Sequence, residues 1–172
     1  MNLDERTARL MNFAGFAMAH GIGGVSSGDT LCTLAIVERE GLDKEGKTRL
    51  ERKLGQFPGK IEASVAQARS ALADDEGLLR AAIIYDGVVT VGDSESSAVV
   101  VETAWKDHLD SPTVAILRYT PISDGGSFRV LGEPLFATAE SDEVEVLLRE
   151  ALMEGARSHD EAFGVWMRAS EG

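Results

Sequence analysis

Two short polar segments hold the side chains whose types and spacing could do chemistry. The first contains His20, Ser26, Ser27 and Asp29, which are the residue types of a Ser-His-Asp hydrolase. Such a site needs an exposed nucleophile on a rigid turn and a base that a third group orients, and the chain has no G-x-S-x-G motif. We interpret His20 as the favourably placed last residue of a helix, and the serines and Asp29 as partners of loop backbone groups.

The second polar segment, residues 105–110, reads WKDHLD and offers Asp107, His108 and Asp110 as metal ligands. Calcium sites need more ligands in a shaped loop, and zinc sites normally use cysteine or more than one histidine. We therefore expect a plain connection between two strands, with no metal and no other cofactor. The catalytic residues, if the protein has any, stay unknown, and His20, Asp29 and His108 are the candidates.

A glycine-rich segment, residues 21–29, reads GIGGVSSGD and raises the question of phosphate binding. A phosphate-binding loop follows a strand and precedes a helix, so that the free N–H groups of the helix meet the anion. Here the predicted order is reversed, and neither G-x-G-x-x-G nor G-K-[ST] is present. We expect the glycines to end a helix at Gly21 and to form a flexible connection.

The second half of the chain concentrates Val, Ile, Thr, Phe and Tyr in short runs that Gly, Asp, Ser and Pro separate. This pattern is typical of an antiparallel meander with at least one buried face. Residues 80–91 are expected to form one strand bent at Gly87, and Pro134 places the last strand at an edge. In the first half, residues 48–55 fit a strand or a short helix. The expected strands cover residues 30–39, 48–54, 80–91, 98–105, 113–119 and 128–136.

Three of the polar side chains inside these strands are considered one by one. Cys32 lies in an apolar run and is interpreted as a core residue, because a buried cysteine behaves as a small hydrophobe. Glu102 and Glu133 are expected on the solvent-exposed face of the sheet. Neither glutamate has a partner that the sequence identifies.

Apolar residues recur at helical spacing in residues 3–19, from Pro58 to Ala73, and after a cap at Ser141 or Asp142. The segment SHDE, residues 158–161, fits a capping box for a short last helix. The chain is therefore predicted to be an α+β protein, with helices on one face of an antiparallel sheet of five to six strands, in the order α-β-β-α-β-β-β-β-α. This order is similar to that of profilin-like and roadblock-like folds, and no sequence family is identified.

Composition favours one globular domain over residues 1–172, with residues 157–172 as a short C-terminal appendage in the alternative interpretation. The chain is 44% hydrophobic and 27% charged, which is ordinary for a folded domain. The single cysteine fits a reducing compartment. We expect no signal peptide, because MNLDERTARL is too polar, and no membrane span. The cytoplasm is the expected location.

The formal net charge is −12, and it is unevenly distributed. Residues 1–72 carry 10 Lys and Arg against 9 Asp and Glu, a net charge of +1, whereas residues 73–172 carry 7 against 20, a net charge of −13. A polyanion would be repelled by the second half, so nucleic acid is not an expected partner. An anionic membrane surface is excluded for the same reason.

The absence of a catalytic motif favours a non-enzymatic protein-interaction module. Secretion chaperones and immunity proteins are small acidic proteins of this kind, each binding one partner protein, and self-association as a homodimer is also compatible with the broad apolar helices. The expected interface residues are Phe13, Phe16, Phe163 and Trp166. The alternative is a small-ligand-binding protein or enzyme whose site combines dispersed residues around His20 and His108, with Asp29 and Arg118.

Overall fold

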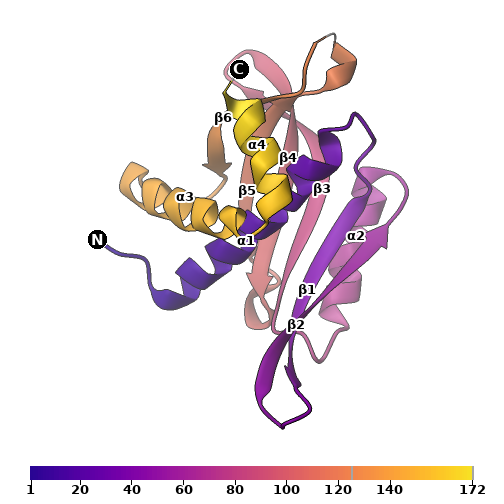
Figure 1. Ribbon diagram of the computed structural model, residues 1–172, viewed down its shortest axis with the longest axis vertical. Coiled ribbons are helices and arrows are strands. Elements are labelled where there is room, and N and C mark those ends of the chain that lie inside the picture. The colour runs from indigo at the N-terminus through magenta and orange to yellow at the C-terminus, as the bar shows by residue number, and fades with distance from the viewer. Residues whose placement is uncertain (125, 172) are drawn as a thin grey trace.

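The fold is a six-stranded antiparallel sheet with helices on both faces, as seen in a computed structural model that describes residues 1–124 and 126–171 (Figure 1). The predicted α+β class and element order are confirmed, with one additional C-terminal helix. The elements are α1 (Glu5–Val25), β1 (Thr33–Leu42), β2 (Thr48–Phe57), α2 (Ile61–Ala73), β3 (Arg80–Val91), β4 (Ser94–Trp105), β5 (Thr113–Thr120), β6 (Arg129–Phe136), α3 (Asp142–Arg157) and α4 (Asp160–Ser170), with short 3-10 turns at Lys106–His108 and Ile122–Asp124.

The strand order in the sheet is β2-β1-β3-β4-β5-β6. Helix α2 carries the chain from edge strand β2 back across the hairpin, so that β3 pairs with β1. The segment at 48–55, left open between strand and helix, is a strand. Residues 80–91 form one strand, as predicted, and pair with β4 through twelve residues. Strand β6 lies at the other edge, where its pairing with β5 is irregular.

The first hairpin extends beyond the rest of the sheet (Figure 1). Strands β1 and β2 pair continuously over ten residues, but β3 pairs with β1 only from Leu34 to Glu38. Residues 39–42 and 48–51 therefore form a two-stranded extension. Because β2 is the terminal strand of the sheet, its outer edge pairs with no other strand of the described chain.

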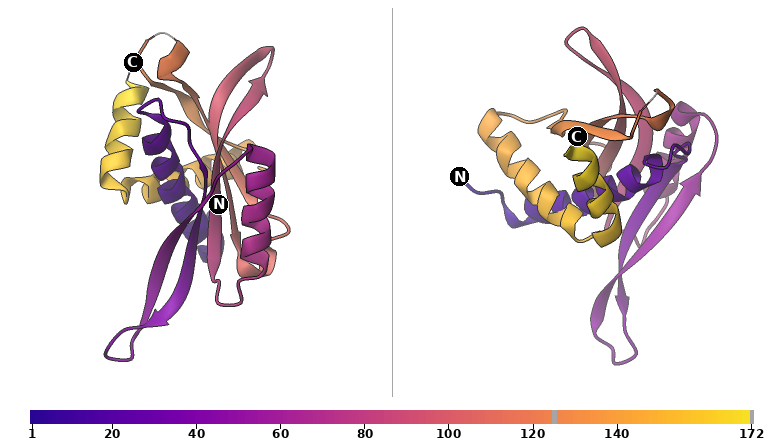
Figure 2. Two further views of the ribbon diagram at one scale, coloured as in Figure 1. Left: turned by 90° about the vertical axis from the view of Figure 1, so that its right-hand side faces the viewer. Right: turned by 45° about the horizontal axis from the view of Figure 1, so that its top comes forward.

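The helices lie on both faces of the sheet (Figure 2), which corrects the expectation that all of them would cover one face. Helices α1, α3 and α4 share one hydrophobic core with the sheet, centred on fully buried Met18, Ile84 and Leu152. Helix α2 packs on the opposite face through a smaller cluster that includes Leu72 and Ile83. Residues 34–37 of β1 and 81–84 of β3 are thereby apolar on both faces, whereas an antiparallel sheet with one solvent-exposed face would alternate.

Helix α1 is longer than predicted and does not end at Gly21. It continues to Val25, and Ser26 caps it by donating its backbone N–H to Ile22. A Cβ at position 21 would lie 2.6 Å from a Val99 methyl and 2.8 Å from an Ile84 methyl. Gly21 therefore lets the helix approach the sheet closely, which is a packing role and not a stop signal.

The C-terminal helices confirm one predicted cap and contradict another. Ser141 caps α3, with its side chain accepting the N–H of Val144 at 3.3 Å. Ser158 forms no capping box with Glu161. Its hydroxyl donates to the carbonyl of Gly155 at 2.6 Å, because the residue belongs to the end of α3. Helix α4 begins after His159 and packs on α1 and β6, and residue 172 of the predicted appendage lies outside the described residues.

In the described part of the chain, no helix combines the length and the apolar character that crossing a membrane requires.

Candidate functional site

Three charged side chains form a ladder across neighbouring strands of the sheet. Arg52 on β2 is paired directly with Glu38 on β1, which in turn is paired with Arg80 on β3. Glu38 is fully buried and accepts one charged hydrogen bond from each arginine, from Arg52 Nε at 2.6 Å and from Arg80 Nε. We call Arg52, Glu38 and Arg80 the charge ladder. It carries two positive charges against one negative charge.

Aromatic rings of α1 and β4 cover the charge ladder. The guanidinium of Arg52 lies 4.4 Å from the ring centre of Phe16, and that of Arg80 lies 4.8 Å from the ring centre of Phe13. Trp105, directly opposite Arg80 on β4, adds a second ring at 5.2 Å. Cation–π contacts of this kind stabilise a partly desolvated guanidinium. They hold the two arginines in place without neutralising them.

The two arginines differ in how many of their guanidinium N–H groups have hydrogen-bond acceptors in the protein. Arg80 also donates through Nη1 to the backbone carbonyl of Arg9 at 2.7 Å, and its side chain is 10% exposed. Arg52 is 41% exposed, and within residues 1–124 and 126–171 its two Nη groups have no protein partner. Arg52 therefore presents its two Nη groups, which carry four N–H donors, on the face of the sheet that α1 covers, beside Phe16, and such a fork suits a carboxylate.

A groove of about 600 Å³ lies against the charge ladder, between α1, α3 and the first hairpin. We call it the arginine groove. Two acidic residues also contribute to it, Glu5, which lies 3.6 Å from Arg9, and the exposed Glu154. Its size is within the range of ligand-binding clefts. Among the described residues that line it, Ser158 has the one hydroxyl, and that hydroxyl donates to the carbonyl of Gly155 at 2.6 Å.

Exposed leucines surround Arg52 on the same face of the hairpin. Leu50 and Leu54 flank it at two residues on either side, and Leu42 lies further along the extension. Their side chains are 54%, 50% and 70% exposed. Single exposed leucines are ordinary, but three on one face of a projecting hairpin, beside an arginine with free donors, form a surface suited to protein contact.

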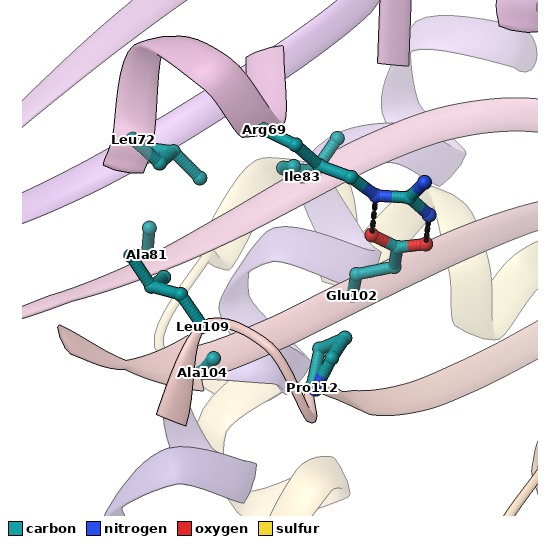
Figure 3. A pocket seen from close by; sticks show the side chains of 8 residues that line it. All are labelled: Arg69, Leu72, Ala81, Ile83, Glu102, Ala104, Leu109 and Pro112. Atoms are coloured by element: carbon teal, nitrogen blue, oxygen red, sulfur yellow. Dashed lines mark hydrogen bonds and ion pairs between the residues drawn. The ribbon is translucent and has the colours of Figure 1, made fainter. Parts of the chain in front are cut away.

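A second ion cluster lies on the opposite face of the sheet, under α2 (Figure 3). Arg69 donates from both Nε and Nη2 to the carboxylate of Glu102, the Nε bond being 3.0 Å long, and Tyr85 donates to the same carboxylate at 3.2 Å. Burial and the charge of Glu102 raise the pKa of Tyr85 to about 12. Glu102 is buried, so the expectation of a solvent-exposed position was wrong. The adjoining cavity measures about 30 Å³, which admits about one water molecule.

His20 and His159 form a contact between α1 and the start of α4. His20 Nδ1 lies 3.0 Å from His159 Nε2, so one ring donates an N–H to the other. Phe16 stacks on His159 with ring centres 4.8 Å apart. Burial lowers the pKa of His20 below its usual 6.5, and the nearby His159 lowers it further. Ser26, which lines the same hollow, is occupied by a hydrogen bond to the carbonyl of Gly23.

The catalytic candidates are not brought together. Asp29 accepts a hydrogen bond from Ser27 at 2.9 Å, and His20 bonds His159 instead. His108 follows Asp107, which is paired with Arg6 near the start of α1. Fourteen residues of helix separate Arg6 from His20, which corresponds to about 21 Å. The two predicted histidine segments therefore lie at opposite ends of α1.

The second polar segment is tied to α1 through its aspartate. The hydrogen bond from Arg6 lowers the pKa of Asp107 below its ordinary value. Both His108 and Asp110 are exposed. Across the described ranges, no group of three or more His, Cys, Asp or Glu side chains is arranged to hold a metal ion.

The four predicted interface residues divide into buried and half-buried pairs. Phe13 is 1% exposed and Trp166 is 2% exposed, and both belong to the core of the single chain. Phe16 and Phe163 are half-buried and pack against that core. Phe16 lies next to Arg52 and thus borders the surface described above. The interface at these residues stays a prediction.

The structure also shows where three further residues from the sequence predictions lie, namely Cys32, Glu133 and Arg118. Cys32 lies before β1 and is half-buried, so it is not a core residue. Glu133 is exposed, as expected, and its carboxylate lies 2.9 Å from a guanidinium nitrogen of Arg149. Arg118 lies on the α2 side of β5, facing away from the arginine groove, and its buried Nε has no hydrogen-bond partner among the described residues.

The charge ladder was not predicted from the sequence. Glu38 and Arg80 fall in phase with apolar residues that face the core, Ile36 before Glu38 and Ala82 after Arg80. The sequence signal that could have revealed it is a pair of opposite charges, each at a core-facing position of a different strand. Their pairing depends on strand register, which the sequence alone did not provide.

Comparison with known proteins provides no relative: no protein family model, no curated protein and no solved structure matches this chain.

Proposed function

We propose that this protein is a non-enzymatic protein-interaction module that binds a partner protein along β2, in the manner of a chaperone or an immunity protein with one client. The observation that carries the proposal is the open ten-residue edge of β2, whose outer half belongs to a two-stranded extension bearing exposed leucines. A two-stranded ribbon is marginally stable by itself. A third strand from a partner would complete it.

The two edges of the sheet support the choice of β2. Strand β6 contains Pro134, Gly132 at a positive φ of 71°, and a register irregularity against β5, all of which interrupt pairing with a further strand. Strand β2 has no proline and pairs with β1 without a bulge. Its charged residues protect it from indiscriminate aggregation and leave it available to a matching partner.

The expected compartment follows from cysteine usage. A single half-buried cysteine, Cys32, supports a reducing environment such as the cytoplasm.

The proposal is tested by site-specific photo-crosslinking in the cells that make the protein. A benzoylphenylalanine replaces Leu50 on β2 or, as the matched control, Val146 on α3, whose exposure of 47% is close to the 54% of Leu50. The proposal predicts a crosslinked partner from position 50 and none from position 146. The captured protein is then purified, and its affinity is measured by calorimetry.

The calorimetric comparison uses the double substitution Leu50→Ser with Leu54→Ser and the control Val146→Ser. Loss of both leucines should weaken binding roughly tenfold or more, because each removes apolar contact area from the interface. The control should bind like the unchanged protein. Equal affinity for all three proteins would contradict the proposal.

A second candidate, small-ligand binding, is favoured by one observation, the volume of the arginine groove. Native mass spectrometry of the protein purified from its own source distinguishes it. A co-purified small anionic mass that Arg52→Met removes would support a ligand-binding protein, and a protein of bare chain mass would count against it.

A further inference from the structure

The charge ladder has an incomplete end at the edge of the sheet. Its charges alternate as positive, negative and positive across β2, β1 and β3. The sequence of signs stops at Arg52 because β2 has no outer neighbour. A carboxylate opposite Arg52 on an added strand would continue the alternation and balance the excess positive charge, since directly paired residues of opposite charge stabilise adjacent strands.

We propose that the occupant of the β2 edge is an extended segment of a partner protein that places an aspartate or glutamate opposite Arg52. This inference rests on the function proposed above and names the chemistry of the segment. The two Nη groups of Arg52 lack protein partners in the described chain and supply the donors. An arginine fork binds a carboxylate through two parallel hydrogen bonds.

The neighbours of Arg52 define the rest of the segment. Leu50 and Leu54 lie on the same face as Arg52, so the residues two positions before and after the acidic residue are apolar. On the opposite face, Glu51 selects a basic neighbour and Lys53 selects an acidic one. For a segment that runs antiparallel to β2, the five residues opposite positions 54, 53, 52, 51 and 50 are apolar, acidic, acidic, basic and apolar, in that order.

A second copy of this chain fits the same edge less well. The antiparallel register that pairs Leu50 with Leu54 of the other copy also places Arg52 opposite itself. Like charges directly opposite each other are destabilising. The observations therefore favour a partner with an acidic segment over a homodimer formed through β2.

The test titrates the isotopically labelled full-length protein with the peptide TSVEEKVTT and follows backbone amides by NMR. Its central glutamate is designed to lie opposite Arg52. We expect shifts concentrated in β2 and β1, and roughly fivefold weaker binding of the peptide TSVEKKVTT, in which that glutamate is lysine, the upper range for an exposed charge pair.

The matched protein variants are Arg52→Gln and Arg49→Gln. Both remove one positive charge from β2, but Arg49 lies on the other face and is paired with Glu51 at 2.8 Å. The inference predicts loss of the preference for glutamate over lysine in Arg52→Gln and its retention in Arg49→Gln. Urea unfolding of Arg52→Gln checks that the variant is folded.

Three outcomes would overturn the inference. Equal affinity for the two peptides would remove the role of the acidic residue, and shifts outside β2 and β1 would place the segment elsewhere. A concentration-dependent dimer that Leu50→Ser with Leu54→Ser abolishes would assign the edge to a second copy. If the crosslinked partner still depends on both leucines while the peptides do not discriminate, the proposed function stands and only the acidic motif fails.

Discussion

At the scale of single residues, the buried carboxylate of Glu38 has the largest consequence for stability. Among residues 1–124 and 126–171, it is the acidic group that pairs with both guanidiniums of the charge ladder, and it is fully excluded from solvent. Breaking a buried ion pair by removing one partner is costly because it leaves an uncompensated charge in the interior. Glu38 therefore contributes to stability mainly by giving the buried guanidinium a counter-charge.

Glu38→Gln should lower the free energy of unfolding by about 3 to 5 kcal/mol, because Arg80 would stay buried without a counter-charge. The control is Glu40→Gln, two residues further along the same face of β1 and exposed, for which a change within about 0.5 kcal/mol is expected. Urea denaturation followed by circular dichroism measures both. A loss below about 1 kcal/mol in Glu38→Gln would show that the charge ladder is not a stabilising element.

At the scale of elements, α1 and α3 are in backbone contact through two glycines. A Cβ at Gly15 would lie 1.8 Å from the carbonyl oxygen of Leu152, and a Cβ at Gly155 would lie 1.8 Å from that of Asn12. No side chain can occupy such a space, so the two helices must separate if either glycine is replaced. The crossing places α3 directly on α1 and closes one side of the arginine groove.

Gly155→Ala should therefore destabilise the protein by roughly 2 to 4 kcal/mol, since backbone atoms have to move. Gly164→Ala in α4 is the control, because the new methyl would meet the flexible end of Arg168 at 3.2 Å. There, the higher helix propensity of alanine should stabilise the protein by about 0.5 to 1 kcal/mol. Thermal unfolding of the two variants side by side distinguishes them, and similar midpoints would refute the close crossing.

The contact between α1 and α4 should depend on pH through His20. Because the pKa of His20 is lowered in the folded state from the usual 6.5, the unfolded chain binds the proton first as the pH falls. Its contribution to stability is thus complete above pH 6.5 and decreases below it. The groups facing this histidine are His159 and, across the adjoining hollow, Glu161.

Urea unfolding between about pH 7.5 and about pH 5.5 measures this dependence. His20→Gln should flatten the decline, whereas His108→Gln, a substitution of the exposed histidine at the other end of α1, should leave it unchanged. An identical slope in the unchanged protein and in His20→Gln would contradict the assignment.

At the scale of the whole molecule, the strands, the helix order and the edge position of β6 were predictable because each depends on local periodicity or on a proline. The end of α1 was not, since Gly21, a typical helix terminator, here serves contact with Val99 and Ile84 from distant strands. The placement of α2 on the second face was also not predicted. Residues 81 and 83 on β3 are apolar like their neighbours, so the strand shows no apolar–polar alternation that would distinguish its two faces.

The candidate site was less predictable than the fold. Histidines drew attention as the residues with the most versatile chemistry, but the structure ties His20 into a helix contact and leaves His108 exposed. The surface at Arg52 depends on register, on a free edge and on exposed leucines in phase. These features exist only once the strands are paired.

The uneven charge distribution of the whole molecule affects where an acidic partner segment can bind. The molecule carries a net charge of −12, yet β2 carries Arg49, Arg52 and Lys53 against one acidic residue, Glu51. A partner segment with carboxylates would be directed to this edge, because the acidic remainder of the surface repels it.

The central claim is that the β2 edge binds a partner strand. It is tested most directly by measuring hydrogen exchange at each β2 amide, first in the free protein and then in the presence of the purified partner that crosslinking identified. An edge strand leaves its outward amides unpaired, so these should exchange rapidly in the free protein. The account predicts that alternate β2 amides slow markedly on binding, as they donate to the added strand. Unchanged exchange in β2, with new protection confined to the opposite edge or to the helices, would contradict it.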